Sequence, residues 1–188
     1  MKFKNVIKKL SKALSNDCDK IVKIIDEYKN NFKKPNESLK LDAFDKVISI
    51  VPLPNDPSYK FDNLNNMAGV YIFVMKNDCP IDKNFNISGK YRAKLRDKSK
   101  LVTGFEKGDI LYVGKCKQLD YRMHSHMDNS ETNKVGSLKL TCNERKNLIG
   151  NFIIFAFCLK QCYKEHYSVI SARIEKELRD KLKPSVGQ

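Results

Sequence analysis

The stretch Gly69-Val70-Tyr71-Ile72-Phe73-Val74-Met75 decides the fold, because it is an unbroken run of mainly β-branched and aromatic residues. Such a run is typical of a strand that is buried on both faces. Two more apolar runs follow, at residues 110–114 and 151–159. We therefore predict a three-stranded sheet, small and mixed or antiparallel, at the centre of the protein.

The residues before this sheet show helical periodicity. Residues 1–34 have two apolar stripes, which predict two short helices with Asn16 or Asp17 as the cap between them. Residues 38–50 carry apolar side chains at helical spacing and are predicted to form a third helix. We therefore expect residues 1–66 to be a helical N-terminal extension.

The residues that link and follow the strands are more varied. Residues 76–107 are polar and basic, residues 118–127 predict a short helix, and residues 129–142 predict a loop. Residues 167–182 predict a well-marked helix, which Pro184 closes. Strands and helices alternate without a regular βαβ rhythm, which favours an α+β domain over residues 67–188.

The net charge is strongly positive, since 36 lysines and arginines against 22 acidic residues leave +14. This charge favours a polyanionic partner, most commonly nucleic acid, although solubility alone also explains it. The longest apolar stretch, residues 152–159, is far shorter than the about 20 residues that span a bilayer. No secretory signal is visible, so we expect a cytoplasmic, intracellular protein without a membrane partner.

The cysteines and histidines do not form a metal-binding pattern. The six cysteines contain no Cys-x-x-Cys pair, and the three histidines complete no zinc spacing. We expect reduced, mostly buried thiols and no structural zinc.

Five polar residues lie inside or next to the apolar elements and could carry chemistry: Tyr71, Tyr112, Arg122, His126 and Glu175. Arg122 and His126 are four residues apart and should share one helix face. Glu175 lies beside the apolar stripe of the last helix, whereas Glu177 should face solvent. A phosphodiester hydrolase needs these groups, namely a carboxylate for a divalent cation, a cation for the phosphate, and a proton acceptor. From spacing alone, the ordinary interpretation is the favoured one, because a tyrosine in a strand is usually a core residue and an arginine on a helix is usually solvated.

The order of these residues resembles the GIY-YIG nuclease family. Gly69-Val70-Tyr71 and Tyr112-Val113-Gly114-Lys115 are similar to its paired signature. The family's arginine, ten residues after the second tyrosine, corresponds to Arg122, and a histidine four residues later to His126. The closing Glu-x-x-Leu pattern that ends in Lys-Pro corresponds to Glu175, Leu178 and Lys183-Pro184.

The resemblance implies a small sheet flanked by helices that cuts nucleic acid with one Mg²⁺ or Mn²⁺. Glu175 would be the metal ligand, and Arg122 would stabilise charge on the scissile phosphate. Tyr71 or Tyr112 would orient or deprotonate the water, with Tyr71 favoured and His126 as the rival proton acceptor. Lys115 and Lys117 would contact phosphate.

The sequence also departs from the family's pattern. Tyr71 and Tyr112 are separated by 40 residues (72–111), whereas the family usually has about ten, so residues 76–107 are interpreted as an insertion. Its basic residues Arg92, Lys94 and Arg96 would bind nucleic acid, unless the insertion is only a solvated loop. Gln188 lies near the position where many members have an asparagine.

A compact nuclease with a helical extension and a basic insertion most resembles a restriction or defence enzyme acting on double-stranded DNA. Cutting both strands of a palindrome would require a homodimer. The alternatives are a repair, homing or structure-specific endonuclease of the same family, and a catalytically inactive nucleic-acid-binding protein on the same fold. A basic interaction protein in which the match is accidental is the last alternative.

Overall fold

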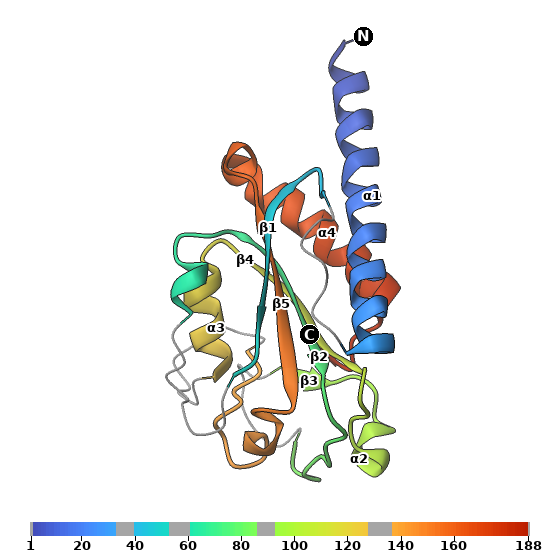
Figure 1. The fold of residues 1–188 in the computed structure, drawn as a ribbon, viewed down its shortest axis with the longest axis vertical. Coiled ribbons are helices and arrows are strands. Elements are labelled where there is room, and N and C mark those ends of the chain that lie inside the picture. The colour runs from blue at the N-terminus through green and yellow to red at the C-terminus, as the bar shows by residue number, and fades with distance from the viewer. Residues whose placement is uncertain (1, 33–39, 53–60, 86–92, 128–136, 188) are drawn as a thin grey trace.

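A computed structural model describes residues 2–32, 40–52, 61–85, 93–127 and 137–187 of the chain (Figure 1). Its centre is an antiparallel sheet with the strand order β1-β5-β2-β4. These strands are β1 (Phe44–Ile50), β2 (Gly69–Met75), β4 (Ile110–Cys116) and β5 (Phe152–Leu159). The predicted α+β class is confirmed, but the prediction of three strands is wrong because β1 adds a fourth.

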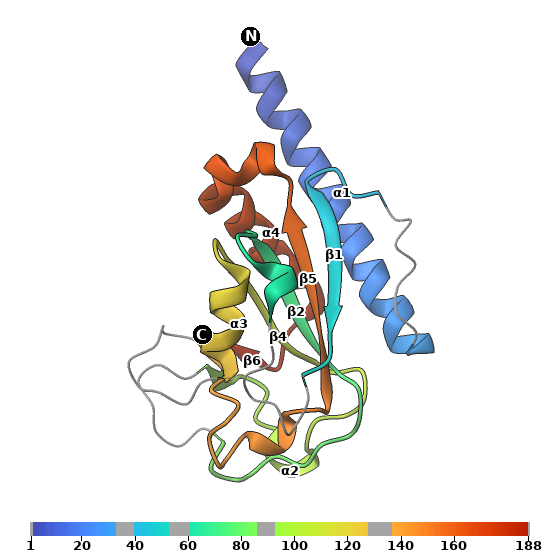
Figure 2. The ribbon, with the colours of Figure 1, turned by 60° about the vertical axis from the view of Figure 1, so that its left-hand side comes forward.

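Helices cover both faces of this sheet. The long helices α1 (Lys2–Asn31) and α4 (Tyr167–Leu182) pack together against one face, and α3 (Leu119–Met127) covers the other. Figure 2 shows α1 and α3 on opposite sides of the sheet. The shorter helical segments are α2 (Lys100–Thr103), η1 (Asp62–Leu64), η2 (Lys146–Leu148) and η3 (Gln161–His166). Among the described residues, no helix has the length and apolar character needed to cross a membrane.

A short second ribbon lies beside the edge strand β4. It pairs β3 (Lys94–Leu95) with β6 (Val186–Gly187), so it joins the 76–107 segment to the C-terminal end of the chain. The backbone N–H of Ser185 donates to the carbonyl of Ile110, 2.8 Å away, which ties this ribbon to β4. The segment predicted to be an insertion is therefore built into the body of the protein.

Strand β1 replaces part of a predicted helix. Residues 38–50 were expected to be helical, but Phe44–Ile50 forms a strand whose ends pair with Leu159 and Ile154 of β5. The β-branched residues Val47 and Ile48 fit a pleated sheet at least as well as a helix. Pairing with β5 decides between the two, and the strand joins the N-terminal segment to the sheet. The division of the chain at residue 66 stays a prediction.

The first predicted helix pair is one continuous helix, α1. Asp17 was expected to cap a helix, but it lies in the middle of α1 and its side chain is fully buried. Its two carboxylate oxygens accept hydrogen bonds from the backbone N–H groups of Asp42 at 2.8 Å and Ala43 at 2.7 Å. The polar side chain therefore anchors the start of β1 to α1 and does not interrupt the helix.

Asp17→Ala is expected to lower the free energy of unfolding by about 3 kcal/mol, because it leaves the part-buried N–H of Asp42 and the buried N–H of Ala43 without their acceptor. Urea denaturation followed by circular dichroism would measure the loss. Asp19→Ala is the matched control, since Asp19 is on the same helix but its side chain is 63% exposed and forms an ion pair with Lys181. A shift as small for Asp17→Ala as for Asp19→Ala would contradict the anchoring role.

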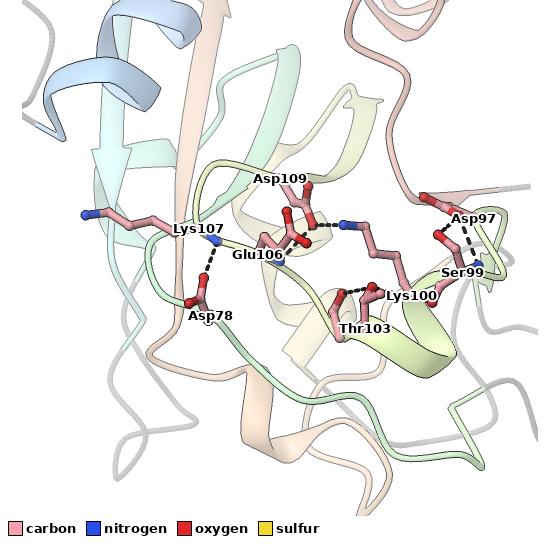
Figure 3. Close-up of polar contacts among 9 residues, drawn as sticks. Asp78, Asp97, Ser99, Lys100, Thr103, Glu106, Lys107 and Asp109 are labelled. Atoms are coloured by element: carbon pink, nitrogen blue, oxygen red, sulfur yellow. Dashed lines mark hydrogen bonds and ion pairs between the residues drawn. The ribbon is translucent and has the colours of Figure 1, made fainter.

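The described parts of the 76–107 segment are packed and internally bonded. Phe85 and Phe105 are buried against each other, with ring centroids 6.1 Å apart. Lys100 forms a 2.7 Å ion pair with Asp109, and Lys107 donates its backbone N–H to Asp78 (Figure 3). These contacts do not fit the alternative of a fully solvated loop.

All six cysteines are free, and Cys18, Cys79, Cys142 and Cys158 are buried. Burial raises the pKa of Cys18 to about 12 and that of Cys158 to about 11, so both thiols stay protonated near neutral pH.

Candidate active site

Two tyrosines from neighbouring strands stack in the core beneath α3. Tyr71 of β2 and Tyr112 of β4 have ring centroids 6.1 Å apart and an interplanar angle of 19°. Gly114 lies opposite Tyr71 within β4, which continues to Cys116. A Cβ atom at Gly114 would overlap the Tyr71 phenol and the Tyr112 ring. The glycine therefore makes room for the tyrosine pair.

Arg122 and His126 meet at the Tyr71 oxygen. As predicted, they lie on one face of α3, and both are buried. Arg122 Nε donates to Tyr71 Oη at 3.1 Å, and His126 Nε2 lies 2.8 Å from the same oxygen. By contrast, His124 lies on the exposed side of α3, with its ring against Phe61. The fold thus brings Arg122 and His126 into contact with the hydroxyl oxygen of a third predicted site residue, Tyr71.

The tautomer of His126 follows from its second contact. The backbone N–H of Leu138 donates to His126 Nδ1 at 3.0 Å, so Nδ1 carries no hydrogen. Burial, together with the positive charges of Arg122 and Lys139, lowers the pKa of His126 well below 6.5, so the ring is neutral. Nε2 then carries the hydrogen and donates it to Tyr71. In this tautomer Nε2 cannot accept a proton, which disfavours His126 as the proton acceptor.

Two opposing effects act on the Tyr71 phenol. Burial and the neighbouring Tyr112 raise its pKa well above 10, whereas the charge and hydrogen bond of Arg122 lower it. For Arg122, burial lowers the pKa, but its interactions with Tyr71 and Tyr112 outweigh burial and raise it. Arg122 is therefore a permanent cation, and the two donors at Tyr71 favour negative charge on the phenol oxygen whenever it forms.

Behind these residues lies a support that sequence reasoning missed. Ser137 accepts a hydrogen bond from Arg122 Nη1 at 3.2 Å. Arg145, only 1% exposed, donates to the carbonyl of Leu138 at 2.6 Å, and its Nη2 donates to the carbonyls of Phe85 and Ala93 at 2.8 and 2.9 Å. Arg145 therefore holds Leu138, the residue that sets the His126 tautomer. The polar stretch 143–147 has no periodicity that could have revealed this role.

Glu175 approaches from the other face of the sheet. It lies on α4, with a side chain 18% exposed, and forms ion pairs with Lys115 Nζ at 3.9 Å and Arg179 Nη1 at 3.7 Å. Burial raises its pKa, while Arg179, Lys115 and Arg122 oppose this shift. No hydrogen bond joins Glu175 to Tyr71, whose described partners are Arg122 and His126. Arg122 is close enough to influence Glu175 electrostatically, which connects the two groups around the edge strand β4.

Glu177 was predicted to face solvent, but it contacts a neighbouring helix instead. Its carboxylate accepts a 2.8 Å hydrogen bond from Ser15 Oγ of α1 and lies 3.7 Å from Lys181 Nζ. The reason is that α1 packs alongside α4, a contact that the sequence did not indicate. Glu177 therefore joins two helices, while Glu175 is the carboxylate on the β4 side.

Glu175 fits a metal ion that is completed by a substrate. No cluster of three or more His, Cys, Asp or Glu side chains suited to a metal occurs in the described part of the chain. Mg²⁺ needs only one or two carboxylates when waters and substrate phosphates supply its other ligands. The ion pairs of Glu175 exceed hydrogen-bond distance, so its oxygens keep lone pairs for a cation.

The basic residues predicted to bind nucleic acid have different surroundings. Lys117, Lys94 and Arg96 are exposed, whereas Lys115 is half-buried and pairs with Glu175. Lys94 belongs to β3 and Arg96 follows it, so both lie next to β6. Arg92 and Gln188 lie outside the described residues.

Comparisons of this chain with protein-family models, with curated proteins and with solved structures gave no match. The resemblance to GIY-YIG nucleases therefore rests only on the order and spacing of the motif residues in the sequence.

Proposed function

We propose that the protein is a metal-dependent endonuclease of the GIY-YIG type that hydrolyses phosphodiester bonds in DNA. One observation carries the proposal: Tyr71 Oη lies between Arg122 Nε at 3.1 Å and His126 Nε2 at 2.8 Å. A tyrosine that serves only packing needs one partner for its hydroxyl group. Here a guanidinium and an oriented imidazole both donate to one oxygen, which favours chemistry in which that oxygen becomes negative.

Each residue then has a defined task. Arg122 stabilises negative charge on the scissile phosphate, and Tyr71 accepts the proton of the attacking water. His126 orients Tyr71, and Tyr112 orients the water or the phosphate. Glu175 would hold Mg²⁺ or Mn²⁺, which when bound polarises the phosphate and lowers the pKa of coordinated water.

The burial of the tyrosines adds a conformational step to this proposal. The Tyr71 side chain is fully buried and Tyr112 is 5% exposed. A phosphate group can reach Tyr71 only after the neighbouring side chains move. We therefore infer that DNA binding opens the site before the cut, as in enzymes that assemble their active site around the substrate.

Within this class, a restriction or defence enzyme is the proposed role, acting on double-stranded DNA as a homodimer. The net charge of +14 supports a polyanionic partner such as DNA. Repair, homing and structure-specific endonucleases of this type are the alternatives. A catalytically inactive DNA-binding protein is favoured only if binding occurs without cleavage.

Metal dependence is the first test. Wild-type protein incubated with unmethylated plasmid or phage DNA should cleave it with Mg²⁺ or Mn²⁺ and stop when a chelator removes the metal. Discrete bands would support a sequence-specific enzyme, and a smear would support non-specific or structure-directed cutting. Protein with Glu175→Gln, purified in parallel, controls for contaminating nucleases. Salt-dependent binding without cleavage would contradict the endonuclease proposal.

A further inference from the structure

Two arginines lie beside Glu175, in a cleft that neither Tyr71 nor Tyr112 lines. Arg96, from the 76–107 segment, and Arg179, from α4, line a cleft of about 240 Å³. Glu175, Lys176 and Asp180 complete its lining. The cleft therefore combines three cations with two carboxylates, one of which is the proposed metal ligand.

The pairing of β3 with β6 brings these two arginines together. Lys183 adopts a left-handed conformation after α4, with φ 47°, and the chain then forms β6 beside β3. The N–H of Arg96 donates to the carbonyl of Ser185 at 2.7 Å, which fixes the backbone of Arg96. A Cβ atom at Gly187 would lie 2.7 Å from Arg179 Nη2 and 2.8 Å from Arg96 Nε. The two guanidinium groups thus flank the same point of the chain.

Two guanidinium groups that flank one point of the chain repel one another, and a nearby anion offsets this repulsion. In the described part of the chain, Arg179 forms an ion pair with Glu175, whose Oε1 lies 3.7 Å from Nη1, beyond hydrogen-bond distance. Arg179 Nε is buried and has no hydrogen-bond acceptor among the described residues. A buried donor without an acceptor is unusual in a folded protein, and a small movement of the Arg179 side chain would let an oxygen atom of a ligand in the cleft supply one.

We propose that Arg96 and Arg179 bind a backbone phosphate of DNA next to the phosphate that is cut. Guanidinium groups are planar forks of N–H donors that match the oxygens of a phosphate, whereas lysines act only as point charges. This inference rests on the proposed function, because it places the phosphate beside the metal ligand Glu175. It also assigns a purpose to the 76–107 segment, which supplies Arg96 to the site.

Binding measurements without cleavage test this site. The protein and its variants Arg96→Gln and Arg179→Gln would be titrated with a short mixed-sequence DNA duplex, in chelator, at several salt concentrations. Each variant should bind about tenfold more weakly. Its slope of log affinity against log salt should be smaller by up to about 0.9, the change for one phosphate contact that is lost in full. Arg173→Gln is the matched control, because Arg173 is exposed on the same helix and does not line the cleft.

A direct reading comes from the side-chain Nε–H signals of the arginines in ¹⁵N–¹H NMR spectra, with the Arg179 signal assigned by its loss in Arg179→Gln. DNA should shift the Arg179 signal in the wild type, and the shift should remain in Arg173→Gln. A shift with inorganic phosphate but not with DNA would overturn the assignment to a nucleic-acid phosphate.

The two proposals fail in different ways. Wild-type DNA cleavage together with unchanged affinity and salt slope in Arg96→Gln and Arg179→Gln would overturn the phosphate site and leave the endonuclease standing. If Arg173→Gln lowered the salt slope as much as Arg179→Gln, the change would come from net charge alone. That result would also overturn the site. Wild-type protein that neither binds nor cuts DNA would overturn both proposals.

Discussion

Glu175→Gln is expected to reduce DNA cleavage by about a thousandfold while the protein stays folded. The amide keeps the size and shape of the side chain but loses the charge that attracts a divalent cation. DNA binding should be kept or strengthened, because a negative charge near the phosphates is removed. Cleavage rates with excess enzyme, together with fluorescence anisotropy of labelled DNA, would separate the two effects.

The stability of this variant should change little. The ion pairs of Glu175 with Lys115 and Arg179 are 3.9 and 3.7 Å long and partly exposed, and such pairs contribute up to about 1 kcal/mol. Glu177→Gln is the matched control on the same helix, since Glu177 bonds to Ser15 and Lys181, away from β4. It should cleave DNA at the wild-type rate. Full activity in Glu175→Gln would remove Glu175 from the proposed metal site.

Tyr71→Phe should produce a second large loss, about a thousandfold in the cleavage rate. The substitution removes one oxygen atom and keeps the ring in the core. It leaves the N–H groups of Arg122 and His126 without their acceptor, which should cost about 2 kcal/mol of stability. Rates for Tyr71→Phe and Tyr112→Phe would be compared at equal occupancy with DNA. A greater loss for Tyr112→Phe would transfer the role of proton acceptor to Tyr112.

The pH dependence gives an independent reading of the same role. Because burial raises the pKa of Tyr71 well above 10, only a small fraction of the phenol is ionised near neutral pH. That fraction grows as the pH rises, so the wild-type rate should increase by about tenfold per pH unit through the neutral range. His126 is neutral throughout this range and should add no break near pH 6.5. A flat profile in the wild type would contradict Tyr71 as the base.

The sequence predicted the elements whose patterns are local. Strand β2 and helix α4 match the predicted residues 69–75 and 167–182, because an unbroken apolar run and a clear helical stripe specify them. Strand β1 was assigned to a helix, since its apolar residues also fit helical spacing and its pairing with β5 is more than 100 residues away in sequence. Asp17 was misread for the same reason, because its hydrogen-bond partners lie on another element.

In the candidate site, too, local contacts could be predicted from the sequence and contacts between distant segments could not. Arg122 and His126 lie one turn apart on α3, so their common face followed from spacing. Their convergence on Tyr71 depends on how α3 packs on the sheet. The pairing of Lys115 with Glu175 and the support of Leu138 by Arg145 depend on segments far apart in the chain. No periodicity encodes such contacts, so only the folded arrangement reveals them.

The hydrogen bonds of Arg145 also bear on how this protein could be redesigned. Its guanidinium joins Phe85 and Ala93 to Leu138, so the 76–107 segment helps to set the residue that orients His126. Excising this segment would leave a buried cation without two of these three carbonyl partners, those of Phe85 and Ala93. The segment is therefore not a transferable module, and chimeras that exchange it between proteins would have to carry Arg145 and its surroundings with it.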